Sequence, residues 1–151
     1  SPDFAMATQS ANHLSDAHYR AIGSLVVGST KIESVIVDLI ANAMQTEIHM
    51  AIIAVDHQKV SSKIQTLRTF FHLAWGDDPS FEPLNKLLNR ASELTDKRNT
   101  YAHAYWIVEP SGTAHAVRFS AKGKFKRSKE AVAAGTIVLV CFLLLAVFKV
   151  V

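Results

Sequence analysis

The sequence predicts an all-α fold, a helical bundle of about five helices with a short β-hairpin inserted before the last helix. Three observations lead to this prediction. Apolar residues recur every three or four positions over residues 25–94, which is the period of amphipathic helices. Residues 105–120 instead combine β-branched and aromatic side chains around one turn, which is typical of a hairpin. The 151 residues are enough for a single domain with a buried core.

Four helices are expected before the hairpin, over residues 25–43, 48–55, 60–74 and about 83–103. Thr46 can cap the second of these helices, because its hydroxyl can accept a hydrogen bond from a free backbone N–H. The turn sequence Gly76-Asp77-Asp78-Pro79 stops the third helix. Pro83 suits the first turn of the fourth, where a missing N–H costs nothing.

The last helix is expected over about residues 129–150, after a basic linker that contains Gly123. From Val132 to Phe148 there is no charged residue. A helix that is apolar all round is buried, either in the bundle or in a dimer interface. The alternative is a transmembrane helix, because about 17 to 25 apolar residues can span a bilayer. The basic residues before it would then lie on the cytoplasmic side. The sequence thus predicts a cytoplasmic protein, with a membrane-associated one as the alternative.

Composition excludes several classes of protein. A single cysteine, Cys141, excludes a disulfide framework and a thiolate metal site and fits a reducing compartment. The sequence contains no glycine-rich phosphate loop and no cysteine–histidine metal spacing, so we expect no metal and no cofactor. Residues 1–5 precede Met6 and resemble a cloning remnant, which leaves residues 6–151 as one domain.

The positive charge is concentrated in one segment. Although the net charge is only +3, residues 118–130 hold six basic side chains against one acid. Such a segment can attract nucleic acid or an anionic membrane. The alternative is a loop that its charge keeps solvated.

A cation, an amide and an imidazole fall within six residues, as Arg98, Asn99 and His103. On an ideal helix Asn99 and His103 are i,i+4 neighbours on one face, whereas Arg98 and His103 leave the axis about 140° apart. For both to act on one phosphate, the helix must end or distort here, or a second subunit must complete the site. The alternative is that the basic residues merely favour the negative end of the helix dipole.

The segment from Arg98 to His103 resembles the HEPN superfamily, whose catalytic members carry an arginine, very often followed by asparagine, shortly before a histidine. The order of helices, hairpin, basic stretch and last helix also resembles these proteins, so the resemblance covers most of the chain. Only the motif is specific, and Ala104 stands where many relatives have glycine. The resemblance implies a homodimer in which the motif-bearing helices meet and two copies of Arg98 and His103 line one cleft.

The resemblance further implies a metal-independent endoribonuclease of the toxin or defence type. His103 would be the general acid or base, Arg98 would hold the phosphate and Asn99 would orient one of them. RNA and an antitoxin or other protein are the expected partners. The residues that could contact RNA are aromatic or basic: Tyr101, Tyr105, Trp106, Lys122, Lys124, Lys126 and Arg127. The alternatives are a non-catalytic dimerising module that binds a nucleotide or partner, and a membrane-associated protein anchored by Val132 to Phe148.

Overall fold

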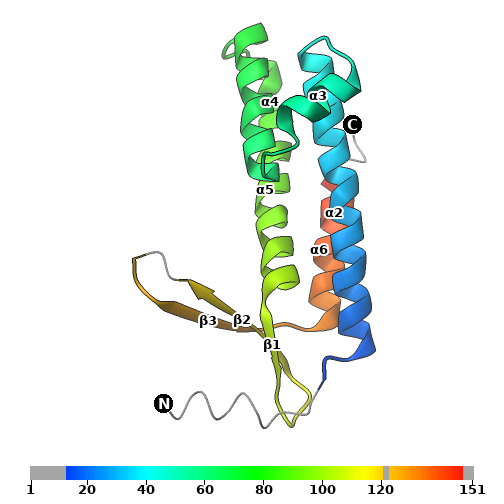
Figure 1. Cartoon of the computed structure of the whole chain (residues 1–151), viewed down its shortest axis with the longest axis vertical. Coiled ribbons are helices and arrows are strands. Elements are labelled where there is room, and N and C mark those ends of the chain that lie inside the picture. Colours follow the sequence, from blue (N-terminus) through cyan, green and yellow to red (C-terminus); the bar gives the residue numbers. More distant parts are fainter. Residues whose placement is uncertain (1–12, 121–122, 148–151) are drawn as a thin grey trace.

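The computed structural model describes residues 13–120 and 123–147. This part of the chain is mostly helical and carries a small antiparallel sheet (Figure 1). Its elements, in chain order, are α2 (Asp16–Ala43), α3 (Ile48–Val55), α4 (Val60–Trp75), the short 3-10 helix η2 (Pro79–Phe81), α5 (Glu82–His103), β1 (Tyr105–Val108), β2 (Ala114–Ser120), β3 (Lys126–Ala131) and α6 (Ala134–Val147). The helical bundle is therefore confirmed, and the sheet is larger than predicted.

Helix α6 packs against both α2 and α5, while α4 packs against the other half of α2 (Figure 1). Two contacts show that α2 and α6 run in the same direction. The His18 Nε2 atom lies 2.9 Å from the carbonyl oxygen of Val132, and the Cys141 thiol lies 3.6 Å from that of Ser24. The sheet lies at the end of the bundle where α2 and α6 begin and α5 ends.

The core consists of the apolar positions whose spacing predicted the helices. Helices α2, α4, α5 and α6 each contribute side chains with almost no exposed surface, namely Leu25, Ile36, Ile40, Ile64, Leu67, Leu88, Leu94, Ile137 and Leu144. Full burial of one such side chain contributes about 1.5–3 kcal/mol. Their number explains how the bundle is stable without a disulfide.

Ser15, Gly76 and Asp78 act at helix ends as expected for their chemistry. The predicted cap by Thr46 is wrong, because the N-cap residue of α3 is Glu47, which makes no side-chain cap hydrogen bond. The Ser15 hydroxyl accepts the backbone N–H of His18 at 3.2 Å and caps α2. Helix α4 ends at Gly76, whose positive φ of 63° is easily adopted only by glycine. The Asp78 carboxylate then accepts the N–H of Ser80 at 2.9 Å, which starts the turn into α5.

The sheet corrects two predictions. Strands β1 and β2 form the predicted hairpin, but β2 also pairs with β3, so the sheet has three strands in the order β1-β2-β3. The prediction that the last helix covers about residues 129–150 is therefore wrong at its start, because α6 begins at Ala134. All six side chains of β3 are exposed, so the strand lacks the alternation of polar and apolar residues that would have revealed it.

Helix α6 covers the central part of the apolar stretch and has 14 residues. Its stripe of Ile137, Val140 and Leu144 is buried in the bundle, whereas Leu139 and Phe142 are exposed. Among residues 13–120 and 123–147, no helix combines the length and the hydropathy that crossing a membrane requires. Phe148 lies outside the described residues.

Candidate functional site

The Arg98–His103 motif occupies the last turn and a half of α5. The helix stays regular to His103, and the extended backbone of Ala104, with φ −71° and ψ 150°, leads into β1. Arg98 leaves the side of the helix that carries the buried Leu94 and Tyr101, and it is half-buried. His103 is exposed on another side, about 140° round the axis.

One hydrogen bond offsets this angular separation. The Arg98 Nη1 atom donates to the Asn99 Oδ1 atom at 2.8 Å, so the guanidinium bends toward Asn99. Asn99 shares a helix face with His103, because residues i and i+4 lie about 40° apart. The angle of about 140° separates the directions in which the two side chains leave the helix axis, whereas the hydrogen bond determines the position of the Arg98 guanidinium. Its Nε atom is buried and has no hydrogen-bond partner in the described part of the chain.

Arg118 was not among the predicted site residues, yet the fold brings it to the motif. Its Nη1 atom donates to the Thr100 hydroxyl at 2.8 Å, and that hydroxyl donates to the carbonyl of Asp96 at 3.0 Å. The last turns of α5 are therefore next to a second guanidinium, supplied by β2. Residues 114, 116 and 118 lie on one face of β2, where Ala114 and Ala116 are buried, but Val117 is buried too, so no clear alternation marked Arg118 in the sequence.

Tyr101 and Trp106, both predicted to contact RNA, join the sheet to the bundle. The Tyr101 side chain is 3% exposed and has no ring face open to a base. Burial raises the pKa of its phenol, and the Glu130 carboxylate raises it further. The Trp106 indole donates to the Tyr101 carbonyl at 3.3 Å, and its ring lies 6.0 Å from that of His18.

The other predicted RNA contacts are on the surface of the sheet. Tyr105 is 71% exposed, and Lys124, Lys126 and Arg127 are exposed in and before β3. Arg127 and Lys126 are consecutive in a strand and therefore project to opposite faces. Lys122 lies outside the described residues.

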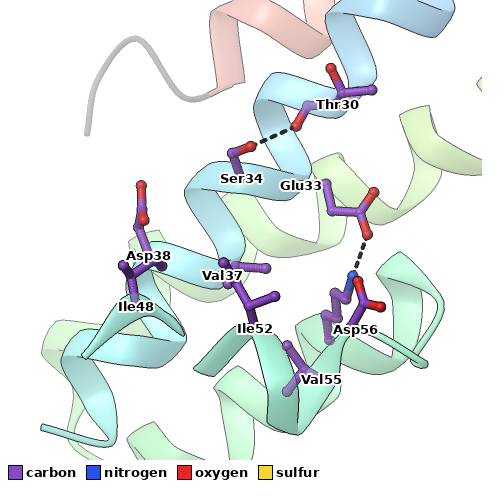
Figure 2. Close-up of a pocket in the computed structure, with 10 residues that line it drawn as sticks. Thr30, Glu33, Ser34, Val37, Asp38, Ile48, Ile52, Val55 and Asp56 are labelled. Atoms are coloured by element: carbon purple, nitrogen blue, oxygen red, sulfur yellow. Dashed lines mark hydrogen bonds and ion pairs between the residues drawn. The ribbon is translucent and has the colours of Figure 1, made fainter. Parts of the chain in front are cut away.

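A groove of about 440 Å³ lies between α2, α3 and α4 (Figure 2). Helix α3 lies in the half of the bundle away from the sheet (Figure 1). The Lys63 side chain is almost fully buried in the groove and forms an ion pair with Glu33. Asp38 and Asp56 also line the groove, so carboxylates outnumber its one cation. An acidic groove of this kind repels phosphate. It is therefore a separate feature from any RNA site.

No group of three or more histidine, cysteine, aspartate or glutamate side chains that could hold a metal ion occurs within the residues that the structure describes. Comparison of the chain with protein-family models, with curated proteins and with solved structures gives no significant match. Function is therefore inferred from the residues themselves.

Proposed function

We propose that the chain is a HEPN-like, dimeric endoribonuclease that cleaves RNA without a metal ion through Arg98 and His103. The observation that carries the proposal is the 2.8 Å hydrogen bond by which Asn99 holds the Arg98 guanidinium on the face shared with the exposed His103. This arrangement places a permanent cation and an imidazole at one end of α5. The toxin or defence role remains an extension of the same proposal.

Each group has a defined task in RNA transesterification. An imidazole exchanges protons near neutral pH, so His103 can take the proton of the ribose 2′-OH as its oxygen attacks the adjacent phosphorus. The bond from phosphorus to the 5′-oxygen then breaks, and that oxygen receives a proton. The products are a 2′,3′-cyclic phosphate and a 5′-hydroxyl. The Arg98 guanidinium stabilises the extra negative charge on the phosphoryl oxygens, because its planar fork matches two of them.

A second copy of the chain supplies the second proton donor in this proposal. One imidazole acts as the base while His103 of the second copy protonates the leaving oxygen. Because a two-fold axis places identical groups on both sides of one cleft, each copy contributes the same residues. Arg118, next to Thr100, adds positive charge beside the motif.

The test compares His103→Ala with His72→Ala in a fluorescent RNA cleavage assay that contains EDTA. Both histidines lie in the last turn of a helix and both are exposed, so both interact with a helix dipole. We expect His103→Ala to abolish cleavage and to leave the dimer intact, as measured by analytical ultracentrifugation. We expect His72→Ala to cleave normally. Undiminished cleavage by His103→Ala would remove the assignment, and so would a wild-type protein that is monomeric yet fully active.

A second candidate function is a dimeric binding module without catalysis. The specific observation in its favour is the outer side of α6, where Val138, Leu139 and Phe142 are 40%, 57% and 68% exposed. Contiguous apolar surface of this kind suits contact with another protein surface. A tight dimer that cleaves no RNA, with or without added divalent cations, would favour this function over the first.

A further inference from the structure

Three aromatic rings lie in contact with one another on the surface of the sheet. Tyr105, Phe119 and Phe125 are 71%, 50% and 74% exposed. The rings of Tyr105 and Phe119 meet edge to face, with centroids 5.8 Å apart, and those of Phe119 and Phe125 stack, also at 5.8 Å. The bundle covers none of these rings fully, although each has a large apolar area. These rings do not fill the core, and a cluster of exposed apolar side chains is typical of a contact surface.

The strand register places Tyr105 and Phe119 on the face of the sheet opposite to the one that packs on the helices, and Phe125, just before β3, stacks on Phe119. Tyr105 lies opposite Val117 and Phe119 lies opposite Arg127, so these residues share one face. The other face carries Trp106 and Ala116, which pack toward the helices. We call the first face, with Tyr105, Phe119 and Phe125, the aromatic face. In Figure 1 the β2–β3 hairpin extends away from the bundle. On this face Val117, opposite Tyr105, is buried, whereas the three rings are exposed.

Basic side chains border the aromatic face. Arg127 lies on it directly across from Phe119, and Lys124 precedes Phe125. Neither has an ion-pair partner among the described residues. Lys129 also lies on this face, where it approaches the Glu109 carboxylate at 3.3 Å. The aromatic face is thus apolar at its centre and positive at its edge.

We propose that the aromatic face binds single-stranded RNA, with bases stacked on the three rings and phosphates held by Arg127 and Lys124. Exposed rings and neighbouring cations are the two features that bind a single strand without reading its sequence. A second copy of the chain fits this face less well, because a two-fold contact would bring the same cations together. The inference takes RNA as the ligand from the proposed function, and it assigns binding to residues outside the cleavage motif.

The experiment measures the anisotropy of a labelled oligouridine of about twelve nucleotides. Full-length chains that carry His103→Ala are used, so that cleavage does not interfere. We expect Phe125→Ala and Phe119→Leu each to raise Kd about tenfold, which is within the range for losing one stacked base. Leu73→Ala, which removes a large apolar side chain of similar exposure from α4, should leave Kd unchanged.

Salt dependence tests the cations separately. Arg127→Gln should reduce the slope of log Kd against log salt by about 0.7, the value for one phosphate contact on a single strand. Lys86→Gln removes the same charge from an exposed position near the start of α5 and should leave the slope unchanged. A duplex of the same length should bind more weakly than the single strand, because its bases are already stacked with each other.

Several results overturn the inference: no binding by the His103→Ala parent chain, equal Kd for the ring variants and Leu73→Ala, or equal binding of duplex and single strand. A change in sedimentation of the ring variants without a change in RNA binding also overturns it, because the face is then covered by a second copy. If the ring variants lose binding while the wild-type chain cleaves nothing, the binding face stands and the proposed ribonuclease activity fails.

Discussion

Replacing Asn99 by alanine removes the side chain that holds the Arg98 guanidinium. The helix itself should tolerate the change, since alanine has a higher helix propensity than asparagine. The guanidinium remains charged, but nothing in the described residues then keeps its Nη1 atom on the face of His103. We therefore expect Asn99→Ala to fold normally and to cleave RNA more slowly.

The size of the effect follows from the hydrogen bond. A hydrogen bond to a charged group contributes about 1.5–3 kcal/mol. Because Arg98 and Asn99 are both only half-buried, water competes for the same groups, and the lower end of this range applies. A loss of about 1.5 kcal/mol in transition-state stabilisation corresponds to roughly a tenfold fall in kcat/KM. In an Arg98→Ala background, Asn99→Ala should have no further effect, because the two residues act together.

Asn89→Ala is the matched control, because Asn89 also lies in α5 and its amide oxygen likewise accepts a hydrogen bond from an arginine, Arg68 of α4. The assay is cleavage of a fluorescent RNA in EDTA, with thermal unfolding to verify the fold. The reasoning is refuted if Asn99→Ala retains wild-type kcat/KM while Arg98→Ala is inactive. It is also refuted if the effects of the two substitutions simply add, since Asn99 then does not act through Arg98.

Three further predictions concern stability and use chemical or thermal unfolding as the measurement. Glu33→Ala leaves the buried Lys63 ammonium without its partner and should lower the free energy of unfolding by about 2 kcal/mol. Lys63→Met should change it by less than about 1 kcal/mol, and equal losses for the two variants would contradict this prediction. Burial raises the pKa of Tyr101 above the ordinary value of 10.0, so its stabilising effect is complete below about pH 10 and is lost as the pH rises through the raised value. Tyr101→Phe should therefore lose less stability than wild type between about pH 8 and pH 11, and identical slopes would exclude the effect. His18→Ala removes the 2.9 Å hydrogen bond to the Val132 carbonyl and should cost about 2 kcal/mol, or roughly 5 °C in Tm; an unchanged Tm would show that water replaces the imidazole.

The helices could be predicted from the sequence because burial selects apolar residues at a helical period. Leu25, Ile64 and Leu88 illustrate this, since each is fully buried at a position that the period marks. Strand β3 could not be predicted in this way. It is an edge strand held by backbone hydrogen bonds to β2, and its sequence from Lys126 to Ala131 carries no pattern of burial.

For the candidate site, the sequence indicated which residues matter but not how they are arranged. The angle between Arg98 and His103 follows from helix geometry, whereas the turn of the guanidinium toward Asn99 depends on rotamers that spacing does not determine. Arg118 reaches Thr100 only because the β1–β2 register places it on the inner face, and that register is not visible in a single chain segment. Phe119 and Phe125 were overlooked for a related reason, since their contact spans the β2–β3 turn.

The parallel pairing of α2 with α6 affects how the protein is made. The bond from His18 to Val132 joins residues 114 positions apart. At about 5–20 residues per second, a ribosome adds Val132 roughly 6 to 23 s after it has added His18. During that interval α2 lacks α6, the helix against which it packs most extensively, and contacts of such long range also slow folding once synthesis is complete. Newly made α2 is therefore the segment of this protein that a chaperone would be expected to bind.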